Sequence, residues 1–539
     1  MRRLPPDFIG RFTPALPYLV LGPLAALLCA QAGLSSWWRM EHDGPMLHYA
    51  AFLMDEHGRF PYRDIFETSM PGAFAFHYAV VKLFGYGDAA YRLVDFALLS
   101  ALLGATYFFM RRFGRAPAAA AVVTFGLVYL SKGQTMTLQR DYLGVVPLAC
   151  ALACLPRDAA GGASLRRFAA AGALFGLSVL VKPHLALGLP VVFGALVAFR
   201  REGRGGSRRD FLRCAAACGL PLLAPPLLAA AWLYANSALG DFVWIFFNYL
   251  PLHLALTGAQ EHLTGLDRAF YFFEQTLQFG GYGPLLLCAL FAGYHFAAQP
   301  GRPREATLSY AALALCALAY LLYPALGGKF WDYHFMPTAY FLSLAAALCF
   351  YAPGSGRRDS FAAALRALLP AVVFAAAVCL QLNLPKYAAA TLRALGPAHR
   401  VVPPKGGRVD EIAAALKERV GPADAVQPLD WANGAIHAML LARARLATEF
   451  MYDYHFYHHA SSPVVEGLRR EFLSQLRQAA PRFIVEVKAD KPWMPAPGGP
   501  GSFPELRRHV EAEYAVAVEG NGYVIYERRA GGGGPPAAR

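Results

Sequence analysis

Three carboxylates in the first polar segment of the chain have the chemistry of a general base. They are Glu41, Asp43 and Asp64. A carboxylate of this kind takes the proton from a hydroxyl group while that group attacks an electrophilic carbon. Asp43 also precedes Gly44-Pro45 and an apolar stretch, a pattern that is typical of a helix N-cap. Both interpretations of Asp43 stay open at the level of the residues.

Basic residues recur in other polar segments, each beside an apolar run. They are Lys132, Arg140, Lys182 and Lys329. Other polar or aromatic residues lie close in sequence to these four cations and to Asp64. They are Tyr62, Arg63, Asp141, His184, Asp332, Tyr333 and His334. Cationic side chains bind a phosphate group through charge-assisted hydrogen bonds, so the four positions predict a phosphate site if they converge. Each cation alone is better explained as an anchor that extends from the end of an apolar segment to water.

The amino-acid composition indicates which kind of secondary structure holds these residues in place. The chain has 539 residues, of which 56% are hydrophobic and 16% are charged, and its mean hydropathy is +0.34. A chain this apolar is typical of proteins whose solvent is the lipid bilayer. Its formal net charge of +14 comes from Arg clusters between apolar runs, which argues against a nucleic-acid partner. We therefore predict an α-helical polytopic membrane protein.

Apolar runs predict about eleven transmembrane helices. They cover residues 15–34, 88–110, 116–131, 141–156, 168–181, 185–199, 214–237, 282–298, 307–326, 336–352 and 366–385. The third to the sixth runs are shorter than the ~20 residues of a straight span. Each of them therefore recruits polar neighbours, or one pair forms a re-entrant loop.

Basic residues predict the orientation of these spans. Arg2, Arg3 and Arg11 precede the first span, which places the N-terminus in the cytoplasm. Every second loop is then basic, as the positive-inside rule requires. Those loops carry Arg111/Arg112/Arg115, Arg157/Arg166/Arg167, Arg200 to Arg213, Arg302/Arg304 and Arg357/Arg358/Arg366. An odd number of spans puts the C-terminus outside the cell membrane.

The first span is predicted to be an uncleaved anchor. The alternative is a signal peptide, because Ala30-Gln31-Ala32 resembles a small-residue cleavage site. Either outcome leaves the orientation of the polar loops unchanged.

The predicted domain organisation has a membrane part and an external part. Residues 1–390 form the transmembrane domain, with long external loops at 35–87 and 238–281. Residues 391–530 form a small extracytoplasmic α/β domain, and the Gly/Pro/Ala-rich residues 531–539 form a disordered tail.

Within the external domain, strand patterns alternate with helical patterns. Residues 425–429 and 483–487 are predicted strands, and residues 463–479 are a predicted helix. The segment Glu519-Gly520-Asn521-Gly522 predicts a closing β-hairpin, because its glycines suit positive φ angles.

No metal centre or disulfide is indicated. All nine cysteines lie in apolar stretches, and none has Cys-x-x-Cys spacing. His455, His458 and His459 lack matching carboxylate or Cys ligands, so a solvated or partner-facing aromatic segment explains them better. We therefore expect no cofactor, with a divalent metal ion possible but not indicated.

Short motifs after the first span carry a resemblance to a known family. They are Asp43, Gly58-Arg59-Phe60-Pro61-Tyr62-Arg63-Asp64, Pro71-Gly72, Phe84-Gly85 and Tyr91-Arg92-Leu93. Over most of its length the chain resembles polytopic GT-C glycosyltransferases. The bacterial branch is the most similar, with lipid A aminoarabinose transferases, rhizobial lipopolysaccharide transferases and protein O-mannosyltransferase relatives.

The resemblance implies a reaction in the cell envelope, at the outer face of the bacterial inner (plasma) membrane. A sugar moves from a polyprenyl-phosphate donor, with inversion and without a nucleotide sugar, to an extracytoplasmic acceptor that is a lipid, a glycan or a protein. Asp43 is the implied general base. The implied phosphate-binding residues are Arg63, Arg140, Lys182 and Lys329, and the implied orienting residues are Asp64, Asp141, Asp332 and His334.

The motif around Asp43 departs from the pattern of many relatives. They carry Asp-Glu followed closely by Tyr, whereas Gly44 follows Asp43 and the first tyrosine is Tyr49. Glu41 and Asp64 therefore stay open as alternative bases.

Three other functions compete with a transferase. A transporter is the first, although clear internal repeats are absent and Asp95 is the best intramembrane carboxylate. The second is another lipid-linked-glycan enzyme, a ligase or a polymerase. The third, a noncatalytic receptor, does not explain polar residues at so many span ends.

Overall fold

The chain folds into two compact units, each discontinuous in sequence. The computed structural model describes residues 15–158, 162–204, 206–277, 281–353, 361–396, 402–491, 493–495, 499 and 501–529. The helical unit comprises Met1–Ser36, Asp95–Leu228 and Thr257–Arg400. The mixed unit comprises Trp37–Val94, Ala229–Leu256 and Val401–Arg539. Outside the described residues lie Arg2, Arg3, Arg11, Arg357, Arg358 and the predicted tail 531–539.

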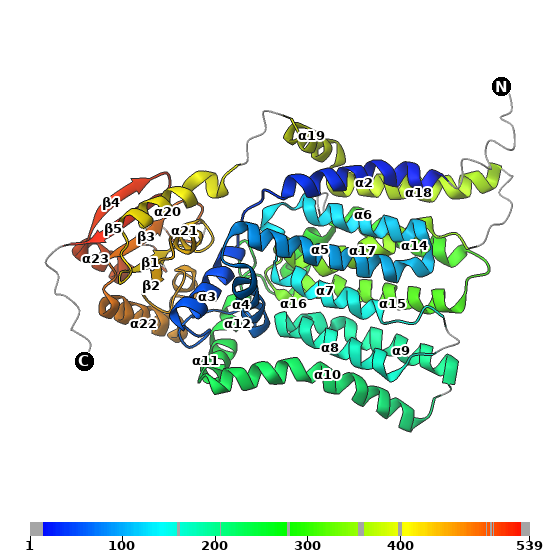
Figure 1. Cartoon of the computed structure of the whole chain (residues 1–539), viewed down its shortest axis with the longest axis horizontal. Coiled ribbons are helices and arrows are strands. Elements are labelled where there is room, and N and C mark those ends of the chain that lie inside the picture. Colours follow the sequence, from blue (N-terminus) through cyan, green and yellow to red (C-terminus); the bar gives the residue numbers. More distant parts are fainter. Residues whose placement is uncertain are drawn as a thin grey trace. The chain divides into compact units, whose positions relative to one another are not determined.

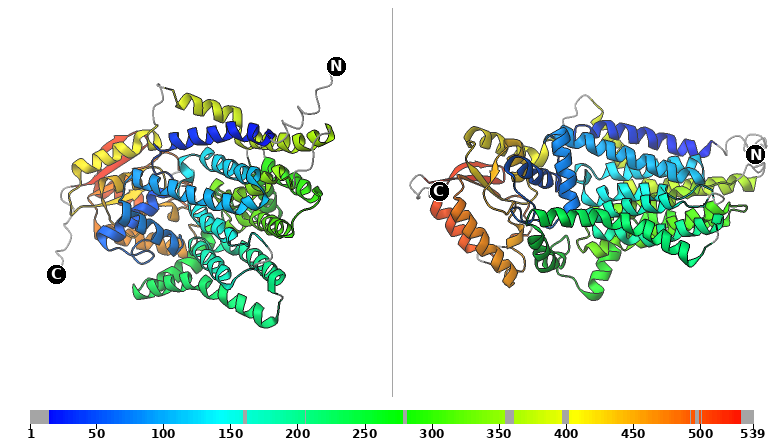
Figure 2. Two further views of the ribbon diagram at one scale, coloured as in Figure 1. Left: turned by 45° about the vertical axis from the view of Figure 1, so that its right-hand side comes forward. Right: turned by 60° about the horizontal axis from the view of Figure 1, so that its bottom comes forward.

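Long helices make up the helical unit, and Figure 1 and Figure 2 show them lying side by side. They are α2 (Leu16–Ser35), α5 (Asp88–Met110), α6 (Arg115–Ser131), α7 (Arg140–Ala153), α8 (Leu165–Val181), α9 (Leu189–Arg204), α10 (Arg208–Ala235), α14 (Gly283–Ala298), α15 (Arg304–Leu321), α17 (Met336–Ala346) and α18 (Phe361–Leu382). The shorter helices are α13 (Gly265–Leu277), α16 (Tyr323–Gly327) and α19 (Leu384–Ala394). Each of the eleven predicted apolar segments is therefore largely helical.

Fewer helices meet the full requirement for crossing a bilayer. In the part of the chain that the structure describes, six helical segments are long and apolar enough. A seventh forms if Ala367–Leu382 and Leu384–Ala394, bent by 63° at their junction, count as one broken span. Helices α6 and α14 are apolar but shorter. The helical membrane class is confirmed, and the count of eleven spans stays a prediction.

Burial separates the centre of the helical unit from its rim. Every residue of α17 is buried, and its Tyr340 hydroxyl lies 2.9 Å from the Thr106 hydroxyl of α5. Helix α10 has the opposite character, with Leu220 72% and Leu228 71% exposed. Leucines exposed to this degree are typical of a surface that faces lipid.

A five-stranded sheet forms the core of the mixed unit. Its strands are β1 (Ala425–Leu429), β2 (Arg445–Leu446), β3 (Phe483–Val487), β4 (Tyr514–Gly520) and β5 (Tyr523–Arg528), in the order β2-β1-β3-β5-β4. Strands β2, β1 and β3 are parallel, whereas β5 is antiparallel to β3 and to β4. The predicted hairpin is confirmed, and Gly522 in its turn has a φ angle of 77°.

Helices complete the mixed unit. They are α3 (Gly44–His57), α4 (Pro71–Phe84), α11 (Leu239–Trp244), α12 (Leu250–Leu254), α20 (Arg408–Arg419), α21 (Ala435–Ala442), α22 (Pro463–Ala479) and α23 (Pro504–Glu513). Helix α21 ends at Ala442, and residues 445–446 form the short strand β2.

Hydrogen bonds tie the segment after the first span to the C-terminal residues of the same unit. The Tyr49 hydroxyl donates to the Ala444 carbonyl at 2.8 Å. The Phe66 backbone N–H donates to the Glu449 carbonyl at 2.9 Å. The first loop and the C-terminal α/β fold therefore form one compact body, which chain order alone does not suggest.

A buried ion pair in the mixed unit gives a test of this fold. Lys491 lies 2.6 Å from Asp453, and the exposed fractions of the two side chains are 3% and 1%. We expect Lys491→Met to destabilise the protein by about 3–5 kcal/mol, because it leaves a buried carboxylate without its cation. The measurement is the thermal unfolding midpoint of the purified chain. The exposed Lys488, replaced in the same way, is the matched control, and an equal midpoint for the two variants contradicts this role of the pair.

Candidate functional site

The predicted site residues divide between the two units. In the mixed unit lie Glu41, Asp43, Tyr62, Arg63 and Asp64. In the helical unit lie Arg140, Asp141, Lys182, His184, Lys329, Asp332, Tyr333 and His334. We call the residues of the mixed unit the carboxylate cluster, although its three carboxylates have separate partners. We call the residues of the helical unit, together with Lys132, the basic cluster.

The turn before Asp43 is held by the Asp88 carboxylate at the start of α5. The Met40 backbone N–H donates to Asp88 Oδ1 at 2.8 Å, and Arg39 Nε donates to Oδ2 at 2.7 Å. The Arg39 guanidinium also pairs with Asp410 of α20 at 2.9 Å. These contacts fix the backbone that leads to the candidate base.

Asp43 itself is buried, with 3% of its surface exposed. It occupies the N-cap position of α3, but its side chain makes no capping hydrogen bond. Instead its Oδ1 lies 2.8 Å from Nδ1 of His42, a residue in the left-handed region with a φ angle of 56°. Residues with side chains rarely adopt this conformation, and it turns the imidazole toward the carboxylate. An imidazole N–H that donates to a carboxylate fixes its orientation.

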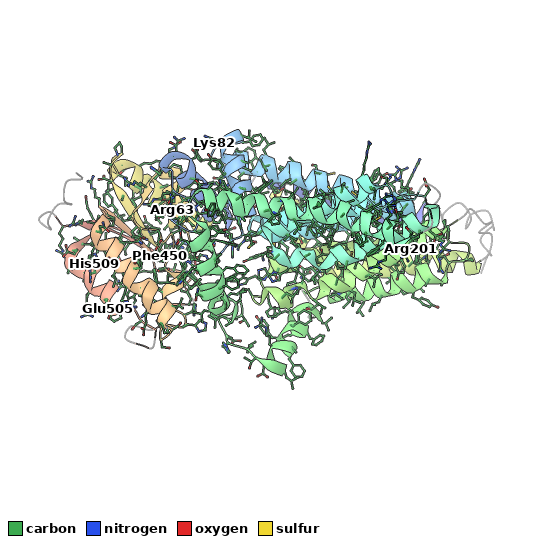
Figure 3. The ribbon with its side chains drawn as sticks, turned by 90° about the horizontal axis from the view of Figure 1, so that it is seen from below. Arg63, Lys82, Arg201, Phe450, Glu505 and His509 are labelled. Atoms are coloured by element: carbon green, nitrogen blue, oxygen red, sulfur yellow. The ribbon has the colours of Figure 1, made fainter. Side chains whose placement is uncertain are left out.

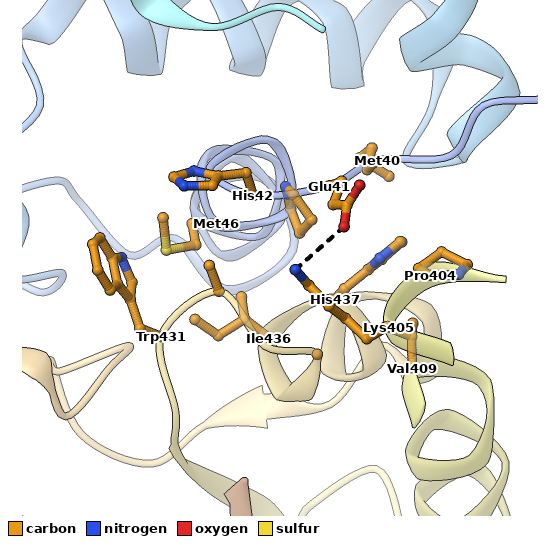
Figure 4. A pocket seen from close by; sticks show the side chains of 13 residues that line it. Met40, Glu41, His42, Met46, Pro404, Lys405, Val409, Trp431, Ile436 and His437 are labelled. Atoms are coloured by element: carbon orange, nitrogen blue, oxygen red, sulfur yellow. Dashed lines mark ion pairs between the residues drawn. The ribbon is translucent and has the colours of Figure 1, made fainter. Parts of the chain in front are cut away.

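Glu41 lines a small pocket, where Figure 4 shows its carboxylate directed toward Lys405. Its carboxylate pairs with Lys405 at 3.2 Å. The other lining residues are Met40, His42, Pro45, Met46, Pro404, Val409, Trp431, Ala432, Gly434, Ile436 and His437. The cavity volume is about 10 Å³, which is the space of one water molecule. Glu41 is therefore engaged in an ion pair in a pocket too small for a sugar.

Asp64 stabilises a tight turn. Its carboxylate accepts hydrogen bonds from the Phe60 backbone N–H at 2.8 Å and from Arg63 Nη2 at 2.7 Å. Burial opposes ionisation, but the Arg63 and Phe60 hydrogen bonds outweigh it and lower the pKa of Asp64. The same turn holds Tyr62, which is 2% exposed and donates its hydroxyl to the Ser69 carbonyl. Figure 3 labels Arg63 at this turn.

Gly44 departs from the motif of the family for a steric reason. A Cβ atom added at Gly44 would lie 2.5 Å from the Tyr91 hydroxyl oxygen. Tyr91 is 1% exposed and packs edge-on against His48 at 5.0 Å between ring centroids. The tyrosine therefore fills the space that a glutamate would need.

The basic cluster centres on Asp141 at the start of α7. Lys182 Nζ lies 2.8 Å from Asp141 Oδ2, and the Tyr323 hydroxyl donates to Oδ1 at 2.7 Å. Asp141 has no exposed surface. His184, in a short 3₁₀ helix at Pro183–Gly188, packs edge-on against Tyr323 at 6.2 Å. Arg140, the first residue of α7, adjoins this group in the chain.

Aromatic rings connect the segment 329–334 to Lys182. The Lys182 ammonium lies 5.9 Å from the centroid of the Tyr333 ring, and Tyr333 lies 5.5 Å from Trp331. Trp331 in turn lies 5.6 Å from the His334 ring and 5.7 Å from Lys329 Nζ. These are cation–π and ring contacts, and they gather the predicted residues of both segments.

The pKa values of the other two lysines of the cluster, Lys329 and Lys132, are shifted in opposite directions. Lys329 is 1% exposed, and burial lowers its pKa to about 7. Lys132 is partly buried, but Tyr282 and Asp332 outweigh the burial and raise its pKa. Asp332 lies 3.3 Å from Lys132 Nζ and is largely exposed. Lys182 and Lys132 therefore each have a carboxylate partner, whereas burial brings the pKa of Lys329 close to neutral pH.

Some residues of the site were missed by sequence reasoning. Tyr323 and Tyr282 pair with charged groups, although no local pattern distinguishes them from other span tyrosines. His42 adjoins Asp43, and that adjacency was the available signal. Within the described residues, no group of three or more His, Cys, Asp or Glu side chains is arranged to hold a metal ion.

Comparisons with known proteins agree with this architecture. The model of the family described as dolichyl-phosphate-mannose-protein mannosyltransferase matches residues 69–228. ArnT from Cupriavidus metallidurans, in a crystal structure bound to undecaprenyl phosphate, is similar with a TM-score of 0.58 and 14% identity over 95% of this chain and 98% of that chain. Its apo structure gives a TM-score of 0.57 and 15% identity over 93% and 96%. No curated protein matches the sequence.

The family match over residues 69–228 and the fold shared with ArnT agree with the predicted resemblance to GT-C glycosyltransferases. The predicted resemblance is thereby confirmed.

The contact at Gly44 yields a test of how the carboxylate cluster is packed. We expect Gly44→Ala to destabilise the protein by about 1–3 kcal/mol, because the new Cβ forces Tyr91 to move. The measurement is the thermal unfolding midpoint. Gly33→Ala in α2 is the matched control, since no atom lies within 4 Å of its added Cβ. If the two variants unfold at the same temperature, Tyr91 does not constrain position 44.

Proposed function

We propose that this protein transfers a sugar from a polyprenyl-phosphate-linked donor to an extracytoplasmic acceptor, with inversion at the anomeric carbon. The observation that carries the proposal is the buried Asp43 carboxylate, oriented by His42 rather than used to cap α3, in a chain with the GT-C fold. The similarity to ArnT, whose crystal structure holds undecaprenyl phosphate, supports a polyprenyl phosphate as the carrier.

Asp43 is the proposed general base. The acceptor oxygen forms a bond to the anomeric carbon while the bond from that carbon to the phosphate oxygen breaks. The bonding electrons leave with the polyprenyl phosphate, and the acceptor proton passes to Asp43. A positioned base of this kind typically contributes a factor of about 10² to 10⁴ to the rate.

The basic cluster supplies the proposed phosphate site. Lys182 and Lys132 lie beside the carboxylates of Asp141 and Asp332, and a bound anion would favour the charged form of Lys329, whose pKa burial lowers to about 7. Cations already in place where the leaving phosphate develops charge lower the barrier. Arg140 and Arg63 are further candidates for the phosphate, and the proposed step uses no metal ion.

The remaining predicted residues have proposed orienting roles. Asp141 holds Lys182 and Tyr323 in place, while the largely exposed Asp332 is available to sugar hydroxyls. Tyr333, His334 and His184 line the same cluster, and Tyr62 and Asp64 fix the turn after α3.

The proposed topology completes this function. About eleven spans in a bacterial inner membrane, with the N-terminus in the cytoplasm, place the C-terminal residues outside. Residues 1–390 form the proposed membrane domain and residues 391–530 the extracytoplasmic α/β domain. The acceptor is then a lipid, a glycan such as lipopolysaccharide, or a protein of the cell envelope.

Replacing the proposed base tests the mechanism. We expect Asp43→Asn to lower the rate of polyprenyl phosphate release by about 100- to 10,000-fold, because the amide accepts no proton. The unfolding midpoint should stay near that of the wild type, since the substitution is isosteric. The measurement is single-turnover release from a labelled polyprenyl-phosphate sugar.

Glu41→Gln and Asp64→Asn are the matched carboxylate controls. Both should retain most of the rate, because Glu41 is paired with Lys405 and Asp64 with Arg63. A loss confined to either control moves the base to that residue.

The pKa of Lys329 predicts a pH dependence of carrier binding. Its lowered pKa, about 7, makes the side chain mostly neutral at pH 8 and mostly charged at pH 6. We expect polyprenyl phosphate to bind about tenfold more tightly to the wild type at pH 6 than at pH 8, relative to Lys329→Arg. The arginine variant stays charged throughout, so its own pH dependence reports titration of the lipid phosphate. Parallel binding curves for the two proteins would exclude Lys329 from the phosphate site.

A further inference from the structure

Helix α13 carries an apolar stripe on its outward face. Leu266, Phe270, Phe273 and Leu277 are 75%, 69%, 54% and 50% exposed. Their spacing of four, three and four residues places them on one side of the helix. A stripe of two phenylalanines and two leucines that faces water costs free energy in proportion to its apolar area.

The opposite face of α13 packs against the protein. The Tyr271 and Phe272 rings lie 5.3 Å and 6.2 Å from the Phe330 ring, and the Arg268 guanidinium lies 6.0 Å from its centroid. Thr276 on this side is buried. A helix of a soluble protein turns its apolar stripe inward, whereas α13 turns its stripe away from the protein.

We propose that α13 lies flat in the membrane interface, with this stripe inserted among the lipids of the bilayer. A helix of 13 residues is about 20 Å long, which is too short to cross a hydrocarbon core of about 30 Å. A short helix with one apolar face and charged edges is typical of an interfacial helix. Asp267 and Glu274 are exposed beside the stripe and keep contact with water.

Continuity with α14 identifies lipid, rather than a protein partner, as the occupant. The Tyr282 backbone N–H donates to the Thr276 carbonyl at 2.9 Å, so the start of α14 is fixed to the end of α13. The outward residues of α14 have the same chemistry, with Leu287 69% and Leu290 64% exposed. The stripe therefore extends an apolar surface that belongs to a bundle helix.

The interfacial helix also bears on the basic cluster. Phe330, which α13 contacts, follows Lys329 in the chain, and the Lys329 carbonyl accepts a hydrogen bond from the Gly258 backbone N–H at 2.7 Å. Lipid that holds α13 in place thus steadies the segment that carries Lys329. This consequence rests on the proposed function, whereas the position of α13 does not.

Spin labels on α13 test the proposal in the full-length chain, reconstituted in vesicles of phosphatidylethanolamine and phosphatidylglycerol. Single substitutions Leu266→Cys, Phe270→Cys, Phe273→Cys and Leu277→Cys are made in a Cys29→Ser background, since Cys29 is the exposed cysteine. Asp267→Cys and Glu274→Cys are the matched controls on the same helix. The readout is accessibility to oxygen, which concentrates in lipid, against accessibility to a water-soluble nickel chelate.

We expect oxygen to relax the four stripe labels more than the chelate does, and the reverse at Asp267 and Glu274. Chelate access at all six positions overturns the proposal, because the helix is then in water. Exclusion of both relaxants with dipolar broadening between labels also overturns it, because a second copy of the chain then covers the stripe. The experiment uses no sugar donor, so failure of the transferase proposal leaves its outcome unchanged. Unfolding midpoints of the labelled proteins identify any variant that is misfolded.

Discussion

The Asp88 carboxylate is the constraint on which the carboxylate cluster depends. It accepts hydrogen bonds from the Met40 backbone N–H and from the Arg39 guanidinium. The imidazole of His437 in α21 lies 3.4 Å from its Oδ1. One partly buried carboxylate thus joins the turn before the candidate base, the start of α5 and a helix of the C-terminal fold. Charges out of water need this kind of multiple compensation, because an unpaired one costs several kcal/mol.

Compensation of buried charge also explains the basic cluster. Lys182 forms an ion pair with Asp141 at 2.8 Å, and at Lys132 the effects of Tyr282 and Asp332 outweigh burial and raise the pKa. Lys329 is buried, with its ammonium 5.7 Å from the centroid of the Trp331 ring, and burial lowers its pKa to about 7. Clustered lysines are suited to bind an added anion, and a phosphate group is the anion that we propose.

The sequence predicted the elements far better than their assembly. Apolar length located the eleven helical segments, and alternation located β1, β3 and the hairpin, because both signals are local. The two-residue strand β2 is too short for any periodicity to be detected. Grouping of the loop around Asp43 with the C-terminal fold depends on contacts such as Tyr49 to Ala444, which join residues far apart in the chain.

The sequence predicted which residue types could form the site, but it did not predict which side chains form ion pairs or hydrogen bonds with one another. Asp43 stood out because it follows the first apolar span, yet its N-cap position suggested a purely structural role that its side chain does not perform. Asp64 and Glu41 were equal candidates by sequence, and only the structure pairs them with Arg63 and Lys405. Lys182 and Asp141 are separated by 41 residues, so their ion pair left no local signal.

The most direct test of the central claim is a donor comparison with the purified wild-type chain. Polyprenyl-phosphate sugars and nucleotide sugars carrying the same labelled sugar are incubated with the protein and a membrane extract as acceptor, and transferred label and free carrier are measured. We predict that at least one polyprenyl-phosphate donor is consumed, with equal amounts of polyprenyl phosphate and glycosylated acceptor formed, and that nucleotide sugars are untouched. Consumption of a nucleotide sugar, or no consumption and no binding of any lipid-linked donor, would contradict the account.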